Sequence, residues 1–392
     1  MSVDLRPETW TTSTNDALTI SLADENGAVK FKPAFTYPIY GDAEQVFGYK
    51  NLQIFLAFDS ITMKPFLNVK YDEKLNTDIP DVQKALLAKL PKDDVILKDE
   101  AKWVDAFTKE QETFSLPDKD TIIDEYNIGD ESFTVYKVSL QVDAVKRIHR
   151  RLQIFTLLFI EAASYIDESD PSWEVVITFN KRTKQCIGYA TTYQFWRYLG
   201  SETFDMSSVD DRKSRAKISQ FLILPPYQGK GHGKYLYTAI FKHWLADQSI
   251  IEITVEDPNE SFDDLRDRCD LERIINERLL SDCPNDLPLK QGWLDRKRLE
   301  LKLEQRQFMR IVEMYLLFSK SSNYRLQLKS RIYEKNYEAL MDMDESTKKD
   351  KLQTAYQSLT DDYKRILSKV NVSKRTKLSS TGSVPVKKSK HE

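Results

Sequence analysis

The chain has 392 residues, 41% of them hydrophobic, and is therefore long enough for two or three domains with buried cores. Its formal net charge of −3 points to no particular class of partner, and its odd number of cysteines, three, argues against a disulfide framework. The four histidines lie far apart in sequence, which argues against a metal site. The N-terminus lacks an apolar signal-peptide core, and no apolar run approaches the roughly 20 residues of a membrane helix. We expect a soluble intracellular protein that binds neither a metal nor a membrane.

Residues 1–115 are expected to form a mixed α/β domain. The segments LTISL, FTYPIYG, YKNLQIFLAF and KPFLNVKY are rich in β-branched and aromatic residues and are separated by turn residues, which predicts strands. DVQKALLAKL and EAKWVDAFTKEQE have apolar residues at helical spacing and are predicted to be helices. The polar residues 111–130 are interpreted as a linker.

Residues 130–270 are predicted to form a second domain, which begins with the strand FTVYKVSL and a helix from about Asp143 to Tyr165. The β-like segments 173–179 and 186–193 flank a polar turn, which predicts a hairpin. A polar insert, Gly200–Arg215, is interpreted as a solvated loop, with a partner-docking loop as the alternative.

The C-terminal part, residues 271–370, has a helical spacing of apolar residues and is predicted to form a helical domain. One such helix is expected around the segment LELKLEQRQFMRIVEMYLLF, and two shorter helices are expected after it. Residues 371–392 are basic, contain few apolar residues and are expected to be disordered. Three interpretations of this tail remain open: a solvated chain end without a function, a nuclear import signal, or a segment that binds nucleic acid.

The stretch 216–268 organises the second domain, because it predicts a strand, a glycine-rich turn, an amphipathic helix and another strand in succession. Glycines let a backbone approach a ligand closely, and the N-terminus of a following helix attracts phosphate. The turn fails the Walker pattern, since Gly233-Lys234 precedes Tyr235, and it fails the dinucleotide pattern, since its third glycine is misplaced. It fits Gln-x-x-Gly-x-Gly from Gln228 to Gly233. That pattern resembles the pyrophosphate loop of the GCN5-related N-acetyltransferases, which bind acetyl-CoA.

Acetyl transfer to a lysine needs a base, because an amine with an unperturbed pKa of about 10.4 is protonated at neutral pH. Glu256 is the leading candidate, since it follows a predicted strand at its carboxyl end and has Asp257 beside it. The sequence Glu-Asp-Pro-Asn is equally typical of a turn, so a purely structural role for Glu256 remains an alternative. Glu161 is the second candidate, because a lone acid in an apolar stretch tends to have a raised pKa. Its alternative is an exposed helix position or a structural ion pair.

Other side chains are weaker candidates for chemistry. His232 lies in the glycine loop, but such a loop binds phosphate through its backbone, so we expect the imidazole to pack. Cys186 or Cys269 would serve only a covalent thioester route, which direct transfer does not need. A cationic peptide would suit the acidic turn Asp42–Glu44 and a cluster of aromatic residues, although aromatic residues equally suit a core. The cluster consists of Trp173, Tyr193, Phe195, Trp196 and Tyr198.

Four segments together resemble one family much more closely than the loop does alone. They are YGDAEQVFGYK, RRLQIFTLLFIEAASYIDESDPSW, RAKISQFLILPPYQGKGHG and ITVEDPNESFDDLRDR. From about residue 5 to 370 the chain is similar to the catalytic subunit of the fungal type B histone acetyltransferase. The resemblance implies an enzyme that uses acetyl-CoA to acetylate lysines in the N-terminal tail of newly made, free histone H4, for chromatin assembly. It also implies histones H4 and H3 and a WD-repeat β-propeller subunit as partners, a place in cytoplasm and nucleus, and no specific nucleic-acid binding.

The same resemblance implies roles for individual residues. Glu256 is the implied general base, with Glu161 and Asp257 as supporting acids. The implied acetyl-CoA contacts are Phe221, Leu222, Ile223, Gln228, Gly229, Lys230, Gly231, His232, Gly233, Lys234, Asn259, Phe262 and Arg268. The implied histone contacts are Asp42, Ala43, Glu44, Trp173, Tyr193, Gln194 and Phe195.

The expected fold class is α+β. It consists of a GCN5-related N-acetyltransferase fold, a mixed sheet flanked by helices, between an N-terminal mixed α/β domain and a C-terminal helical domain. Two alternative functions remain open. One is acetyl transfer to another lysine or amine substrate, and the other is a histone-binding chaperone subunit that keeps a cofactor site for stability.

Overall fold

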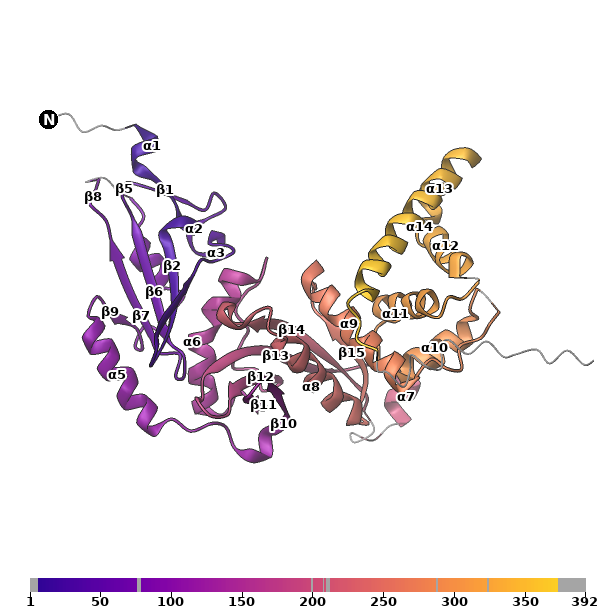
Figure 1. The fold of residues 1–392 in the computed structure, drawn as a ribbon, viewed down its shortest axis with the longest axis horizontal. Coiled ribbons are helices and arrows are strands. Elements are labelled where there is room, and N and C mark those ends of the chain that lie inside the picture. Colours follow the sequence, from indigo (N-terminus) through magenta and orange to yellow (C-terminus); the bar gives the residue numbers. More distant parts are fainter. Residues whose placement is uncertain are drawn as a thin grey trace, which may run out of the picture. The chain divides into compact units, whose positions relative to one another are not determined.

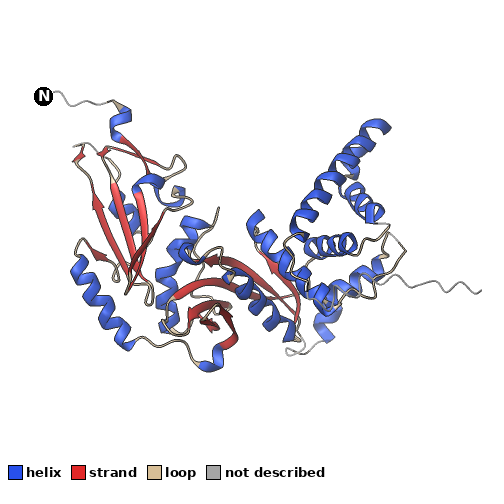
Figure 2. Ribbon diagram, viewed as in Figure 1, coloured by secondary structure: helices blue, strands red, loops and turns tan. Residues whose placement is uncertain are grey.

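A computed structural model describes residues 6–75, 79–198, 200–206, 208, 212–286, 288–322 and 324–372. These residues fall into two compact units, and each is described by itself. The first unit takes in Met1–Ser207 and Ala216–Ala246, and the second takes in Ser208–Arg215 and Asp247–Glu392. The first contains two large groups of strands with helices, whereas the second is mostly helical (Figures 1 and 2). The predicted tail falls almost wholly on residues 373–392, which lie outside the described part of the chain.

The N-terminal sheet of the first unit has the strand order β3-β2-β6-β7-β9. Strand β2 pairs in parallel with β6, and β7 pairs in parallel with β9, while the remaining pairs are antiparallel. Along β2, buried and partly exposed residues alternate, as expected where one face of a sheet packs on a core. The strands are β2 (Leu18–Asp24), β3 (Gly27–Phe31), β6 (Gln53–Asp59), β7 (Pro65–Lys70) and β9 (Ile96–Leu97).

Short elements surround this sheet. They are α1 (Pro7–Trp10), β1 (Thr11–Ser13), α2 (Thr14–Ala17), α3 (Tyr37–Tyr40), β4 (Gln45–Phe47), β5 (Tyr49–Lys50), β8 (Glu73–Lys74), α4 (Val82–Leu87) and α5 (Glu100–Thr113). The strand predicted from FTYPIYG is wrong, because this segment forms the helical turn α3. Pro38 lies in its first turn, where a missing N–H costs nothing, and Gly41, with φ 88°, ends it.

The second sheet of this unit has the order β10-β11-β12-β13-β14. The predicted hairpin is confirmed, since Trp173 on β12 lies opposite Tyr193 on β13. The predicted linker 111–130 is wrong, because it contains the end of α5, a short 3₁₀ helix (Lys119–Thr121) and β10, whose residues are stabilised by pairing with β11. The strands are β10 (Ile122–Ile128), β11 (Glu131–Ser139), β12 (Trp173–Asn180), β13 (Cys186–Trp196) and β14 (Ser214–Ile223).

Helix α6 (Asp143–Phe159) joins the cores of the two sheets. Its Phe155 packs against Phe58 of β6 with ring centroids 4.8 Å apart, and one continuous cluster of buried residues contains side chains from both sheets. The helix ends at Phe159 and not near Tyr165 as predicted. The carbonyl of Leu158 accepts N–H groups from Ala34 and Phe35, at 2.9 and 3.1 Å, and the chain turns away after it.

The remaining elements of the first unit are α7 (Ser201–Met206), a 3₁₀ turn (Pro225–Tyr227) and α8 (His232–Ala246). Helix α7 lies within the insert that was interpreted as a solvated loop. Helix α8 confirms the predicted amphipathic helix, since Leu236, Ala239, Ile240 and Trp244 are all buried.

The second unit contains β15 (Ile250–Val255) and six helices among its described residues. Helix α9 begins at Glu260, about ten residues before the predicted start, because the Asn259 side chain caps it by accepting the N–H of Phe262 at 2.9 Å. The single helix predicted around 299–318 is interrupted, since Lys302 accepts the N–H of Ile253 from β15. The helices are α9 (Glu260–Glu277), α10 (Gln291–Glu300), α11 (Gln305–Phe318), α12 (Tyr324–Lys335), α13 (Tyr337–Met341) and α14 (Glu345–Leu367).

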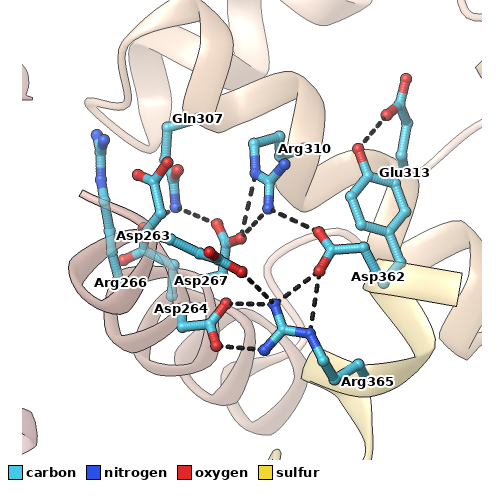
Figure 3. Close-up of polar contacts among 12 residues, drawn as sticks. Asp263, Asp264, Arg266, Asp267, Gln307, Arg310, Glu313, Asp362 and Arg365 are labelled. Carbon is cyan, nitrogen blue, oxygen red and sulfur yellow. Dashed lines mark hydrogen bonds and ion pairs between the residues drawn. The ribbon is translucent and has the colours of Figure 1, made fainter. Parts of the chain in front are cut away.

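A network of ion pairs connects α9, α11 and α14 (Figure 3). Asp267 is fully buried on α9 and accepts hydrogen bonds from Arg310 at 2.6 Å and from Gln307 at 3.0 Å, both on α11. Arg365 on α14 bonds to Asp264 on α9 at 2.7 Å. Because every buried carboxylate here has a donor, the network fixes how the three helices pack.

Candidate active site

The glycine-rich turn lies between β14 and α8, as the sequence predicts. Gln228 donates from its side-chain amide to the carbonyl of Ile223 at 2.8 Å, which closes the turn onto the end of the strand. Gly229 and Gly231 have φ of 73° and 100°, values that a residue with a Cβ adopts only with strain. The turn therefore leads directly into the N-terminus of a 15-residue helix, an arrangement that suits a pyrophosphate.

His232 anchors this turn from the side. Its Nδ1 lies 2.7 Å from the hydroxyl of Tyr126 on β10, and only 3% of the residue is exposed. Burial, followed by the nearby charge of Lys230, lowers the pKa of His232 to about 4, so the ring is neutral at physiological pH. This confirms the expectation that the imidazole packs.

A close contact between β13 and β14 sets the position of the strand that precedes the turn. A Cβ added at Gly188 would lie 2.6 Å from the carbonyl oxygen of Leu222 and 2.8 Å from the Cα of Ile223. Only glycine fits at this point, since both neighbours are backbone atoms. Leu222 and Ile223 are buried, so their side chains belong to the core, and any ligand contact would come from their backbone.

Glu161 lies in a turn after α6 and is exposed, in contrast to the predicted position on a helix in apolar surroundings. The alternative of an exposed helix position is also wrong, because α6 ends at Phe159. The next residue, Ala162, has φ 56°, and its N–H donates to the hydroxyl of Tyr37 at 2.6 Å. The turn thus reaches α3, which directly precedes the acidic segment Asp42–Glu44.

The three residues of that acidic segment differ in their surroundings. Asp42 and Ala43 are exposed, whereas Glu44 is partly buried. The carboxylate of Glu44 accepts the N–H of Thr36 at 2.5 Å, the N–H of Tyr37 at 3.1 Å and the side-chain amide of Asn15 at 2.7 Å. The hydrogen bond from the Thr36 backbone is the main reason that the pKa of Glu44 is lowered. Glu44 thus holds the start of α3 as an ionised cap.

The predicted aromatic surface lies at the end of the β12–β13 hairpin. Trp173 and Tyr193 contact edge to face with centroids 4.8 Å apart, and Phe195 follows Tyr193 at 6.4 Å. The hydroxyl of Tyr193 donates to Asp170 at 2.9 Å. Phe195 and Trp196 are 36% and 43% exposed, so this end of the hairpin is not an ordinary core.

Glu256 and Asp257 belong to the second unit. Both are exposed and follow β15 directly, which confirms that Glu256 stands at the carboxyl end of a strand. Asp257 has φ 35°, so the chain turns sharply there toward α9. Asn259, Phe262 and Arg268 follow in the cap and first turns of α9, and the Asn259 side chain is engaged in capping.

The covalent route through Cys186 can be set aside. Cys186 is fully buried, and burial raises the pKa of its thiol to about 12, so it does not supply a thiolate for acetyl transfer. Within the described ranges, no group of three or more histidine, cysteine, aspartate or glutamate residues could hold a metal ion. In the same part of the chain, no helix is both long enough and apolar enough to cross a membrane.

Three residues near these elements were missed from the sequence: Tyr37, Tyr126 and Gln220. Gln220 on β14 is 4% exposed and donates to the carbonyl of Ser164 at 2.8 Å, which ties the strand to the Glu161 turn. Each partner lies 56 or more residues away in sequence, so no local pattern reveals the contact.

Comparison with known proteins identifies the fold and the family. The model of the acetyltransferase (GNAT) family matches residues 145–263, which contain α6, the hairpin, the glycine turn and β15. The model of the histone acetyl transferase HAT1 N-terminus matches residues 10–161, and that of the fungal HAT1 C-terminal region matches residues 267–321. The fold is therefore that of a GNAT acetyltransferase with flanking α/β and helical regions, as predicted.

The similarity to curated relatives covers almost the whole chain. The histone acetyltransferase type B catalytic subunit of Kluyveromyces lactis is 71% identical over 97% of this chain and 98% of that protein. The subunits of Eremothecium gossypii and Candida glabrata are 54% and 51% identical, over 94% and 95% of this chain and 94% and 97% of those proteins. The site is thus that of an acetyltransferase that uses acetyl-CoA. The chain belongs to the family of histone acetyltransferase type B catalytic subunits.

Replacing Gly231 with alanine tests the glycine turn. The substitution forces φ near 100° on a residue with a Cβ, so the turn should shift and bind the pyrophosphate less well. We expect the KM for acetyl-CoA to rise about tenfold, which corresponds to roughly 1.4 kcal/mol, with a smaller change in kcat. Steady-state kinetics measure both, and Gly129→Ala, in a β10–β11 turn with φ 58°, is the control for backbone strain elsewhere. An unchanged KM in Gly231→Ala contradicts the assigned role of the turn.

Proposed function

We propose that this enzyme transfers the acetyl group of acetyl-CoA to lysines in the N-terminal tail of newly made, free histone H4. The observation that carries the proposal is that the chain combines the acetyltransferase turn with an N-terminal region matching the histone acetyltransferase family. The exposed acid Asp42, near the capping carboxylate of Glu44, offers a negative surface to a lysine-rich tail. The aromatic end of the β12–β13 hairpin suits the apolar stems and the charge of lysine side chains.

Glu256 is the proposed general base, with Asp257 and Glu161 as supporting acids. Its carboxylate takes a proton from the lysine ammonium, directly or through water. The neutral amine then attacks the thioester carbonyl and a C–N bond forms. The C–S bond breaks, and the proton lost by the attacking nitrogen goes to the sulfur, so that coenzyme A leaves as its thiol. Backbone N–H groups of Phe221 to Ile223 are proposed to stabilise the oxyanion, and the Gln228–Lys234 segment to hold the pyrophosphate.

Mass mapping of acetyl groups tests the substrate. Free histones H3 and H4 are incubated with the enzyme and acetyl-CoA, and the modified lysines are located by peptide mass spectrometry. We expect acetylation to concentrate in the H4 tail and to exceed that of spermidine and unrelated lysine peptides. Equal rates of acetylation on the H4 tail, spermidine and unrelated lysine peptides would contradict the proposed specificity for histone H4.

We further propose a WD-repeat β-propeller histone-binding subunit as the partner, and a place in cytoplasm and nucleus. The proposal rests on the resemblance to the type B enzymes. Co-purification of the tagged chain from cell extract, followed by mass spectrometry of its partners in cytoplasmic and nuclear fractions, tests both points. Absence of a β-propeller protein from both fractions would contradict the proposed assembly.

A further inference from the structure

The turn that carries Glu161 is held at several points. The hydroxyl of Tyr37 accepts the N–H of Ala162 at 2.6 Å. The hydroxyl of Tyr165 donates to the carbonyl of Lys89 at 2.6 Å, and Gln220 donates to the carbonyl of Ser164 at 2.8 Å. The two ends of the turn are thus fixed to different elements, with Tyr37 bonded next to Glu161 itself.

Tyr37 is itself well fixed. Its N–H donates to the carboxylate of Glu44 at 3.1 Å, and its ring contacts Phe35 edge to face with centroids 5.8 Å apart. The same carboxylate accepts the N–H of Thr36, whose hydroxyl lies 2.5 Å from that of the buried Thr14. A hydroxyl at the end of a rigid ring, held on a capped helical turn, provides a fixed acceptor for the Ala162 N–H.

The bond to Tyr37 matters because Ala162 adopts a left-handed conformation. With φ 56°, a residue other than glycine is strained, so the turn needs tertiary contacts to keep this shape. The peptide group between Glu161 and Ala162 supplies the N–H that Tyr37 accepts, so this bond restrains the plane of that peptide, which contains the Glu161 Cα atom. Glu161 and Ala162 are exposed, so core packing does not do this instead.

We propose that Tyr37 is a positioning residue for the acetyltransferase reaction, which holds Glu161 in place through the Ala162 N–H. The proposal rests on the proposed role of Glu161 as a supporting acid. It also gives Glu44 a positioning function beside the predicted histone contact, since Glu44 fixes the segment that carries Tyr37.

Tyr37→Phe removes only the accepting oxygen. We expect kcat on mixed free histones to fall about tenfold, since small misplacements of a catalytic group are costly, while KM for acetyl-CoA and the melting temperature stay near wild type. Tyr40→Phe is the matched control, because Tyr40 lies on the same short helix but donates to the carbonyl of Val82 at 3.2 Å. Its kcat should equal that of the wild type.

A double-mutant cycle with Glu161→Gln separates positioning from other effects. If Tyr37 acts through Glu161, then Tyr37→Phe should lower kcat no further once Glu161 is replaced. Ala162→Gly keeps the N–H and relieves the strain at φ 56°, so in this background Tyr37→Phe should lower kcat less than it does in the wild type. Wild-type kcat in Tyr37→Phe, or an equal loss with and without Glu161, overturns the inference.

The proposed H4 specificity fails separately. The H4 assignment is wrong if the wild-type enzyme does not concentrate acetyl groups in the H4 tail. The positioning test does not depend on that result, because it compares the kcat of variants on any free histone that the wild type acetylates. If Glu161→Gln alone leaves kcat unchanged, the supporting role of Glu161 and this inference are both overturned, while the H4 assignment is unaffected.

Discussion

Replacing Glu256 with glutamine should lower kcat at neutral pH by about 10²- to 10⁴-fold, the range that general-base catalysis contributes. The amide keeps the shape of the side chain but does not accept a proton. Glu256 is exposed in the turn after β15, so the change should not disturb the fold. The KM for acetyl-CoA should stay near wild type, because the proposed cofactor turn is unchanged.

The effect of Glu256→Gln on kcat should also depend on pH. The neutral fraction of a lysine amine with a pKa near 10.4 increases about tenfold with each unit by which the pH rises toward that value, so the need for a base diminishes as the pH rises. The ratio of wild-type to variant kcat should therefore shrink between about pH 7 and pH 9.5. Glu277→Gln, an exposed acid at the far end of α9, is the control and should leave kcat unchanged. A kcat for Glu256→Gln equal to wild type at pH 7 would falsify the assignment.

Replacing Arg151 with methionine should destabilise the first unit by about 3–5 kcal/mol, as expected when one partner of a buried ion-pair network is lost. Arg151 lies on α6 and is 1% exposed. Its guanidinium bonds to Asp94 at 2.9 and 3.1 Å, to Glu110 at 2.6 and 3.1 Å, and to the carbonyl of Thr62 at 2.7 Å. The variant leaves both carboxylates partly buried, with Lys64 as a remaining cation.

Urea unfolding followed by tryptophan fluorescence measures this loss. Trp103 is a suitable reporter, because it is buried on α5 and donates to the carbonyl of Lys64 at 3.0 Å. Arg150→Met is the matched control, since the neighbouring Arg150 is half exposed and pairs with Glu168 on the surface, where a pair contributes at most about 1 kcal/mol. Equal urea midpoints for the two variants would contradict the prediction.

The free energy of unfolding that is lost in Arg151→Met should also depend on pH. Burial of Asp94 opposes its ionisation, but the hydrogen bond and charge of Arg151, with help from Lys64, outweigh this and lower the pKa of Asp94 below its usual value. A carboxyl with a lowered folded-state pKa contributes stability above its unfolded pKa of about 3.9 and loses it as the pH falls through the folded value. The difference between wild type and Arg151→Met should therefore be full at neutral pH and narrow in strong acid.

Much of the fold follows from local patterns. The β12–β13 hairpin, the amphipathic helix α8 and the glycine turn between β14 and α8 were predicted from alternation, helical spacing and glycine placement. Errors occurred where a distant partner decides the outcome. Strand β10 looks like a polar linker and becomes a strand only by pairing with β11. Helix α6 ends at Phe159, where Ala34 and Phe35 donate to the Leu158 carbonyl in place of a further helical turn.

The sequence by itself determined the family, the glycine turn between β14 and α8, and the position of a carboxylate after β15, because each depends on short segments with characteristic residue types and spacing. Only the tertiary structure decided the surroundings of Glu161. Its turn is shaped by Tyr37, 125 residues from Ala162, and by Gln220, 56 residues from Ser164. Likewise the buried Arg151 looks like any helix arginine until Asp94 and Glu110 are brought to it from 57 and 41 residues away. Local propensity does not contain such contacts, since they arise only when the core around α6 closes.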